Sequence, residues 1–520
     1  MNKEHKTRDE ILYSLKNSNY SLIIIGGGVI GASIALKASK AGISTLLLEK
    51  HDFSYGASSR TCKMLTANYN DFNIKNTLST YKKIKERNKV ANKASAIDLE
   101  IVQPIYEAES AKVFQYILKS NVYDLFSLFS NRKKSKFLTR NSTINTLGDI
   151  NSTAIISGIE YSESSIDDSR YVLELLMKAK KYSADVLNYA EVKAFDYNEN
   201  NINSVVFLDR VSGRIYEVPA DNIIIACGAW GKNLASTLPY GNFDNTAEYV
   251  KATNLIINAN IAHIDKSLFL PKIKNRPNIF FNKWKNTIVI GPVVRKYNGD
   301  LDCIYSASDE IEYLIDIYNT YFTSIVNKNH ITTTQSGMMP VDPNDIKIHT
   351  HKNYKLYMVE GGDFTLSDKT ANMALSKVYS NIDFNDNDKI LKNNIDMDIE
   401  WVLSEETIHF LYKYYSSYDL LLRLNEYCKN DSSLLLSIGL DDRIPRGLIK
   451  YFIEFEDAVH LDDIMIRRLR FILTEDDCGT LISEYIANEM SNYLGWDSKR
   501  EEWEIKRYRT EIKRARVSLY

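Results

Sequence analysis

The sequence has 520 residues, of which 44% are hydrophobic and 25% are charged. This length exceeds what one hydrophobic core usually supports, so we expect a soluble globular protein of two or three domains. With 65 basic and 67 acidic side chains the net charge is -2, which excludes a general attraction for nucleic acid. Five cysteines without a CxxC pair argue against a disulfide framework or a metal site, and they agree with a cytoplasmic protein.

The polar N-terminus, MNKEHKTRDEILYSLKNSNY, does not have the pattern of a signal peptide. The longest apolar run, SLIIIGGGVIGASIAL, is interrupted by four glycines and is shorter than a bilayer span. We therefore expect no transmembrane helix. A peripheral membrane contact stays compatible with the sequence, because it needs only a local apolar or basic patch.

The first predicted elements are a strand, a glycine turn, a helix and a second strand. The β-branched run Ser21–Ile25 leads into the turn, and ISTLLLEK predicts the next strand, which ends at Glu49. Gly26, Gly28 and Gly31 have the GxGxxG spacing, which permits a tight turn and close approach of the backbone to a pyrophosphate. Glu49 is placed to bind ribose hydroxyls. The unit predicts a dinucleotide site, with NAD and FAD both open.

The loop after the second predicted strand, HDFSYGASSRTCK, favours a flavin dinucleotide. Ser58, Ser59 and Arg60 place two hydroxyls and a guanidinium where a second nucleotide phosphate would lie. A solvated polar loop is the alternative interpretation of the same residues.

The rest of the chain alternates between helical and strand patterns up to about residue 386 and is then almost wholly helical. Asp167 and Asp168 have the pattern of helix-capping residues, and Ser212-Gly213 predicts a hairpin turn. Ile223–Ala226 reads as a buried strand that ends near Gly228. The segment KLYMVEGGDFTLSDK repeats the strand, glycine turn and helix pattern.

Over nearly its full length the sequence resembles the FAD-dependent glycerol-3-phosphate dehydrogenases and the related α-glycerophosphate oxidases. The segments that carry this resemblance are IIIGGGVIGASIAL, EKHDFSYGASSR, YSESSIDDSRYVL, ACGAW, SGMMP, EGGDFT and the tail DAVHLDDIMIRRLRFIL. The resemblance implies an α/β FAD-binding fold of the glutathione-reductase type, an antiparallel-sheet substrate domain and an all-α C-terminal domain. It also implies a small-molecule substrate, with quinone or oxygen as the electron acceptor. A homodimer and a contact with the inner face of the cell membrane are compatible with it.

The resemblance and the glycine pattern together divide the chain and assign the cofactor residues. The FAD-binding domain would consist of residues 18–75, 150–235 and 355–385, the substrate domain of 76–149 and 236–354, and the helical domain of 386–520. The residues predicted to hold FAD are Gly26, Gly28, Ile30, Gly31, Glu49, Lys50, Ser58, Ser59, Arg60, Lys63, Val192, Gly228, Gly361, Gly362, Phe364 and Thr365.

The sequence departs from the family where the substrate would bind. Family members oxidise C2 of glycerol 3-phosphate, which requires a base for the hydroxyl proton and cations for the phosphate. Asn254 stands where the family has histidine, Met339 where it has an arginine that grips the phosphate, and Asp363 where it has lysine. The family's His-Gly-Gly-Leu-Arg-Tyr is replaced by Thr66, Ala67, Asn68, Tyr69, Asn70 and Asp71.

Three interpretations of these departures stay open. In the first, the protein still oxidises glycerol 3-phosphate, and the replacement cations come from Lys251, Arg295, Lys296, His349 and His351, which are otherwise ordinary surface or loop residues. In the second, it is a flavin oxidoreductase for a non-phosphorylated or cationic substrate, with Asp363 and Asn254 as weak catalytic candidates. Asp363 as a simple helix cap is the alternative. In the third, it is a catalytically silent flavoprotein with a binding role.

Overall fold

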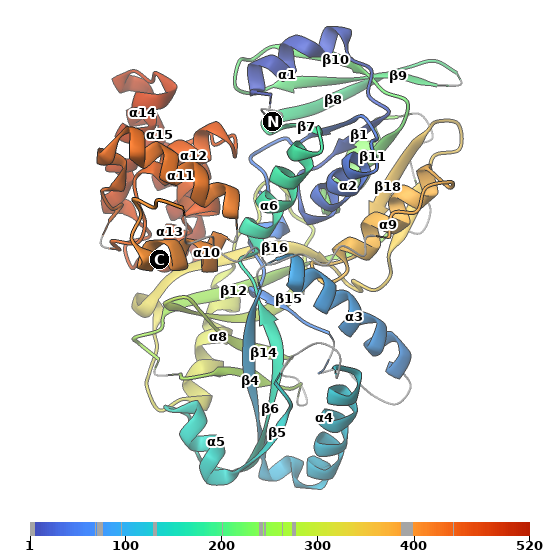
Figure 1. Ribbon diagram of the computed structural model, residues 1–520. Coiled ribbons are helices and arrows are strands. Elements are labelled where there is room, and N and C mark those ends of the chain that lie inside the picture. The colour runs from blue at the N-terminus through green and yellow to red at the C-terminus, as the bar shows by residue number, and fades with distance from the viewer. Residues whose placement is uncertain are drawn as a thin grey trace.

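A computed structural model gives the structure of this chain. It describes residues 6–67, 69, 76–94, 96–127, 133–199, 201–238, 243, 246–262, 264–272, 277–385, 399–415, 417–439 and 441–519. Figure 1 shows the strands in two main groups, with the C-terminal helices gathered at one side of the molecule.

A six-stranded sheet carries the glycine turn. Its strands, in the order β17-β18-β11-β1-β2-β7, are β17 (Lys347–Thr350), β18 (Leu356–Glu360), β11 (Ile223–Ile225), β1 (Leu22–Ile25), β2 (Thr45–Leu48) and β7 (Asp185–Leu187). All pairs are parallel except β17 with β18. The inner strands are continuous apolar runs because both faces of this sheet are buried.

Different layers cover the two faces of the six-stranded sheet. The buried core on one face includes side chains of α2 (Val29–Lys40), α6 (Asp168–Lys181) and α9 (Ser367–Val378). The core on the other face includes side chains of a three-stranded antiparallel sheet and of α1. Those elements are β8 (Ala190–Tyr197), β9 (Ile202–Asp209), β10 (Ile215–Pro219) and α1 (Arg8–Ser14). β9 and β10 form the predicted hairpin, which turns through Gly213 at a φ of 72°.

A nine-stranded sheet forms the second group. Its strands are β16 (Ile331–Pro340), β12 (Tyr249–Asn258), β15 (Thr287–Lys296), β14 (Ile279–Trp284), β13 (Ser267–Leu270), β4 (Ile97–Tyr106), β6 (Ile155–Ser165) and β3 (Met64–Leu65) in order, with β5 (Lys136–Thr139) pairing β6. The pairs are antiparallel except β13 with β4. The neighbouring helices are α3 (Thr77–Lys93), α4 (Val113–Ser127), α5 (Arg140–Leu147) and α8 (Ser308–Tyr321), whereas α7 (Gly231–Ala235) packs against β18 of the six-stranded sheet.

From residue 399 onward the described chain is helical, as predicted, and has a hydrophobic core of its own. Its helices are α10 (Glu405–Tyr415), α11 (Tyr418–Asn430), α12 (Gly447–Glu454), α13 (Phe471–Thr474), α14 (Thr480–Leu494) and α15 (Ser498–Ala515), with a π-helical turn at Asp463–Arg468. Figure 1 shows these helices beside α6. Among the described helices, none has the length and apolar character needed to cross a membrane.

β3 lies in the nine-stranded sheet although its segment, 18–75, was assigned to the FAD-binding domain. Two longer strands also lie in a different sheet from the one that the predicted segments imply. β6 falls within 150–235, which we assigned to the FAD-binding domain, yet it pairs with β4 in the nine-stranded sheet. β17 falls within 236–354, which we assigned to the substrate domain, yet it forms a hairpin with β18 in the six-stranded sheet. In both cases the sheet is decided by the strand with which the segment forms main-chain hydrogen bonds. The pattern of side chains in the sequence does not reveal that partner. The division into domains stays a prediction.

Candidate functional site

The glycine turn joins the end of β1 to the start of α2. Gly26 has a φ of 114°, and a Cβ atom there would lie 2.6 Å from the carbonyl oxygen of Ala226. A Cβ on Gly31 would lie 1.9 Å from the carbonyl oxygen of Gly26, so helix and strand pack too closely for any side chain at this position. The turn thus brings the amide end of α2 directly against the ends of the parallel strands, where an anion is attracted.

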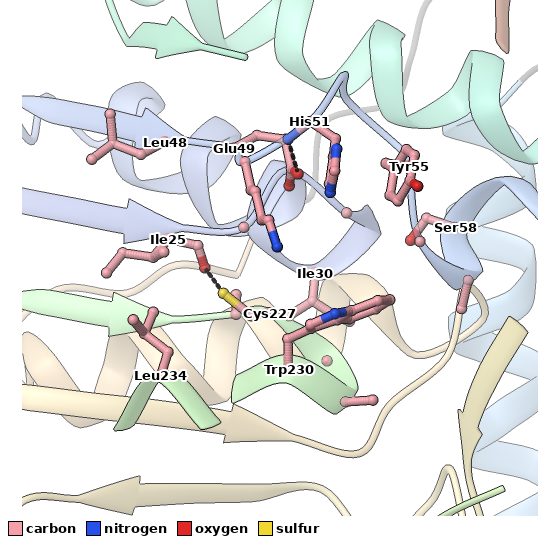
Figure 2. Close-up of a pocket in the computed structure, with 18 of the residues that line it drawn as sticks. Ile25, Ile30, Leu48, Glu49, His51, Tyr55, Ser58, Cys227, Trp230 and Leu234 are labelled. Carbon is pink, nitrogen blue, oxygen red and sulfur yellow. Dashed lines mark hydrogen bonds between the residues drawn. The ribbon is translucent and has the colours of Figure 1, made fainter. Parts of the chain in front are cut away.

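A cavity of about 330 Å³ lies at this turn (Figure 2). It is at the carboxyl ends of β1, β2 and β11, the edge at which open parallel sheets bind ligands. The predicted cofactor residues that line it are Gly26, Gly28, Ile30, Glu49, Lys50, Ser58, Val192 and Gly228. Half of the predicted set therefore comes together at one cavity, although its members are far apart in the sequence.

Glu49 follows β2 and presents its carboxylate to the cavity (Figure 2). One oxygen accepts the backbone N–H of Gly27 at 2.6 Å, and the other accepts that of His51 at 2.9 Å. Burial raises the pKa of Glu49, and these two hydrogen bonds act in the opposite direction. Each carboxylate oxygen keeps a second lone pair, which is what binding of ribose hydroxyls requires.

Ser58 lies at the N-terminus of α2. Its Oγ accepts the backbone N–H of Val29 at 3.0 Å, so the hydroxyl proton is left to donate to an anion at the helix end. The other two polar residues predicted with it lie outside the cavity lining. Ser59 is buried, and the Arg60 guanidinium donates to the carbonyl oxygen of Ser336 at 3.1 Å.

Aromatic rings that were not predicted from the sequence form two sides of the cavity. The His51 ring stacks on Tyr55 with centroids 3.9 Å apart, and Figure 2 shows Trp230 on the opposite side. Burial, with the cations Arg210 and Lys50, lowers the pKa of His51 to about 3, so this ring is neutral at neutral pH. His51 and Tyr55 belong to the loop HDFSYGASSR, but aromatic residues in a loop do not by themselves indicate a ligand.

Asp302 lies in the loop after β15 and bridges two residues of the cavity. Its carboxylate accepts Lys50 Nζ at 2.8 Å and Trp230 Nε1 at 2.9 Å, and these partners lower the pKa of Asp302 against the effect of its partial burial. No pattern in the sequence points to Asp302, because its partners are 252 and 72 residues away.

The remaining predicted cofactor residues do not line the cavity; they are Gly31, Ser59, Arg60, Lys63, Gly361, Gly362, Phe364 and Thr365. The second glycine turn is nevertheless close to it, because a Cβ on Gly362 would lie 3.4 Å from Cδ1 of Ile30. Thr365 Oγ1 donates to the carbonyl oxygen of Thr66 at 3.1 Å. Lys63 is fully buried and pairs with Asp168 at 2.7 Å, so its ammonium points away from the cavity into the protein.

The two weak catalytic candidates have structural partners and lie outside the cavity lining. Asp363 Oδ1 accepts the backbone N–H of Leu366 at 2.9 Å at the entrance to α9, and Oδ2 accepts Lys83 Nζ at 3.2 Å. This agrees with a capping role. Asn254 is buried; its Oδ1 accepts the Cys62 thiol at 3.1 Å, and its Nδ2 donates to the carbonyl oxygen of Arg60 at 3.4 Å.

Most of the suggested replacement cations also have partners within the protein. Lys251 pairs with Glu310 at 3.0 Å, Arg295 with Asp309 at 2.5 Å and His349 with Glu360 at 2.9 Å. The His351 ring stacks on Tyr354, and Lys296 is exposed at the end of β15. On β16, Met338 lines the cavity and Met339 is half-buried. Asn68, Asn70 and Asp71 lie outside the described residues.

Two family models match the chain. One, described as FAD dependent oxidoreductase, matches residues 21–369, and one described as the C-terminal domain of alpha-glycerophosphate oxidase matches residues 358–501. Aerobic glycerol-3-phosphate dehydrogenases of Staphylococcus epidermidis and Staphylococcus aureus are each 25% identical, over 349 and 352 residues. These alignments cover 65% of this chain and 62% of the length of the relatives.

Solved structures share the fold. A glycerol-3-phosphate dehydrogenase from Bacillus halodurans complexed with FAD has a TM-score of 0.78 at 20% identity and covers 99% of this chain and 98% of its own. A glycine oxidase from Bacillus cereus has a TM-score of 0.53 at 17% identity, over 69% of this chain and 95% of its own. The α/β FAD-binding fold with an antiparallel sheet and a helical C-terminal region is therefore confirmed, and so is the resemblance seen in the sequence.

FAD is the cofactor of this fold, and the described residues fit its dinucleotide. The glycines of the turn leave no room for side chains, so the backbone at the helix end can approach the diphosphate directly. Ser58 offers a hydroxyl at the same place. Glu49 offers a carboxylate for the ribose. In addition, Nε2 of His51 is buried and has no hydrogen-bond partner among the residues that the structure describes, as expected beside a ligand.

Proposed function

The chain belongs to the family of FAD-dependent oxidoreductases, and on that premise we propose that it oxidises a small organic substrate that carries no phosphate group. When bound, FAD supplies an acceptor for the hydride of a C–H bond next to a hydroxyl or amine. One observation carries the proposal. Lys251 and Arg295, two of the suggested replacement cations, are already paired with carboxylates of this chain, and Met339 stands where the family has its arginine.

Lys251 illustrates why these cations are poor phosphate ligands. Its Nζ is within 3.0 Å of Glu310, which is buried and also accepts the Thr253 hydroxyl at 2.9 Å. Moving Lys251 to a substrate would leave Glu310 as an uncompensated buried charge, which typically costs about 3–5 kcal/mol. A phosphate contact contributes about 1.5–3 kcal/mol, so the exchange is unfavourable.

A cationic substrate is also less well supported than a neutral one. Asp363 was the anion suggested for an amine, and its carboxylate is shared between Lys83 and the backbone of α9. Met338 adds an apolar side chain to the cavity. A neutral hydroxy compound therefore agrees best with the groups present, with quinone or oxygen as the proposed acceptor of the electrons.

Glycerol 3-phosphate is the second candidate, because the staphylococcal relatives are named for it. The chain spans 62% of the length of those relatives, and their activity is proposed here only by that similarity.

An anaerobic spectroscopic experiment separates the two candidates. The purified protein with FAD is mixed with glycerol 3-phosphate, with glycerol and with a panel of neutral small alcohols, and the flavin band is followed. We expect bleaching by a compound without phosphate and none by glycerol 3-phosphate. Bleaching by glycerol 3-phosphate would reverse the order of the candidates. If only dithionite bleaches the flavin, the silent flavoprotein of the third interpretation gains support.

A further inference from the structure

The loop Asp52–Lys63 contributes residues to the lining of the cavity, and both of its ends are held by buried contacts. Tyr55 and Ser58 face the cavity from the centre of the loop. Both ends contact the same short segment of the C-terminal helical region, Arg467–Arg470. This segment is more than 400 residues away in the sequence.

At the first end, Asp52 accepts hydrogen bonds from two arginines. Its carboxylate is fully buried and accepts Arg467 Nε and, at 2.9 Å, Arg468 Nη1. Arg468 also donates to the carbonyl oxygen of Glu456 at 2.7 Å. Burial alone would raise the pKa of Asp52. The attraction of the two arginines and their hydrogen bonds outweigh this effect and lower the pKa, so the carboxylate stays ionised. The start of the loop is thus fixed to the helical region by buried, charge-assisted hydrogen bonds.

At the second end lies a group that we call the Asp168 cluster, made of Thr61, Lys63, Asp168 and Arg470. Asp168 Oδ2 accepts the backbone N–H of Thr61 at 3.0 Å, its hydroxyl at 2.8 Å and Lys63 Nζ at 2.7 Å. Oδ1 accepts Arg470 Nη2 at 2.9 Å. One buried carboxylate therefore joins the loop, the start of α6 and the C-terminal helical region.

The carbonyl oxygen of Ser59 connects the Asp168 cluster to the cavity. It accepts Lys63 Nζ at 2.9 Å, Arg470 Nη2 at 3.1 Å and, more weakly, Gln335 Nε2 at 3.3 Å. The residue before it, Ser58, lines the cavity and caps α2. A shift of the Ser59 carbonyl would therefore move the hydroxyl that is offered to the FAD diphosphate.

Backbone conformation and charge both indicate that this arrangement serves a ligand. Lys63 and Arg470 hold left-handed backbone, with φ of 60° and 69°, a conformation that costs free energy and clusters at active sites and ligand clamps. The cluster and its neighbours contain three cations, Lys63, Arg470 and Lys285, beside two carboxylates, Asp167 and Asp168. Burial and the nearby Arg470 lower the pKa of Lys63 to about 8. An anion bound in front of the loop would relieve this excess of positive charge.

We propose that Arg470, acting through the Asp168 cluster, is a positioning residue for FAD, and that the affinity for FAD therefore depends on a side chain of the C-terminal helical region. Arg470 does not line the cavity. It sets the position of Ser59, which sets the position of Ser58 at the diphosphate. The proposal rests on FAD binding at this cavity and not on the identity of the substrate.

The test measures FAD binding to the full-length apoprotein by quenching of flavin fluorescence. For Arg470→Met we expect a dissociation constant about 10- to 100-fold higher than that of the wild type, as expected for the loss of charged hydrogen bonds. The control is Arg446→Met, which removes a partly buried arginine whose partner, Glu489 at 2.8 Å, lies within the helical region itself. The control should bind FAD within about threefold of the wild type. An unchanged dissociation constant in folded Arg470→Met would overturn the proposal.

Two further measurements cover the case in which Arg470→Met does not fold. The first uses Lys63→Met and Asp168→Asn, which change the same cluster from the other side, with folding checked by circular dichroism of the apoprotein. The second needs no variant. Because coupling between two sites is reciprocal, an ordered segment that tightens FAD binding is itself stabilised by FAD, so FAD should slow hydrogen exchange of the amides in Ile466–Leu473 of the wild-type chain by the same factor. If the rate of hydrogen exchange in this segment is the same with and without FAD, the proposal is contradicted.

Discussion

Trp230 donates its indole N–H to Asp302 at 2.9 Å, and this hydrogen bond joins the turn after β11 to a loop of the nine-stranded sheet. Lys50 reaches the same carboxylate at 2.8 Å, so Asp302 links two sides of the FAD cavity. The Asp302 side chain is 45% exposed, which weakens the ion pair through solvent screening.

The bridge predicts an effect on the rate at which FAD leaves. Asp302→Ala should increase the dissociation rate of FAD about 3- to 10-fold, because two contacts that hold Lys50 and Trp230 are lost, each in partly exposed surroundings. Dilution of the holoprotein, followed by the rise of flavin fluorescence, measures this rate. Asp309→Ala, which removes an exposed ion pair with Arg295 outside the cavity, is the control. Equal rates in the two variants would show that the bridge does not retain the cofactor.

Gly31 provides a test of the packing between α2 and β1. A Cβ atom at this position would lie 1.9 Å from the carbonyl oxygen of Gly26, and backbone cannot move aside as a flexible side chain does. Gly31→Ala should lower the free energy of unfolding by about 1–3 kcal/mol or more, and FAD should no longer be retained on purification. Urea unfolding followed by circular dichroism measures the loss. In Gly231→Ala the nearest contact would be 3.5 Å, so this variant should keep both stability and cofactor.

The sequence predicts that the glycine turn and Glu49 lie together, because both belong to one continuous segment. Leu22 to Glu49 form one strand, helix and strand unit, and local spacing fixes where each residue lies. Asp302 and Arg470 were not predicted, since the partners that place them at the site are between 72 and 411 residues away and nothing local marks them. That Lys63 contacts FAD stays a prediction made from its place in the loop. Lys63 has left-handed backbone and its ammonium donates to Asp168, and the pattern of residues shows neither feature.

The burial of Glu174 on α6 leads to a prediction of how the free energy of unfolding changes with pH. Burial raises the pKa of Glu174 to about 7, and its Oε2 has no hydrogen-bond partner among the described residues. Below its unfolded pKa the carboxyl is protonated in both states. Between that value and about 7 the unfolded chain binds fewer protons than the folded one, so the contribution of Glu174 to stability falls as the pH rises.

The matching variant is Glu174→Gln, which resembles the protonated form at every pH. It should equal the wild type in stability near the acid end of this window and exceed it above neutral pH, by an amount on the order of 3 kcal/mol. Unfolding in urea at several pH values measures the difference. The exposed Glu484, changed to Gln, is the control and should show no such trend. A difference that is constant with pH would contradict the raised pKa.

Variants of Lys251 and Glu310 distinguish a structural role of Lys251 from a role in substrate binding. If Lys251 serves only Glu310, Lys251→Met should lower the free energy of unfolding by about 3–5 kcal/mol, because a buried carboxylate loses its cation. The double variant Lys251→Met with Glu310→Gln should recover most of that loss, since no buried charge remains, and Gln can still accept the Thr253 hydroxyl and the backbone N–H of Ala307. Chemical unfolding of the three proteins gives the coupling energy. If instead Lys251→Met keeps its stability and abolishes flavin bleaching by glycerol 3-phosphate, Lys251 is a phosphate ligand. In that case the substrate is the family's own, and the pairing with Glu310 is broken when it binds.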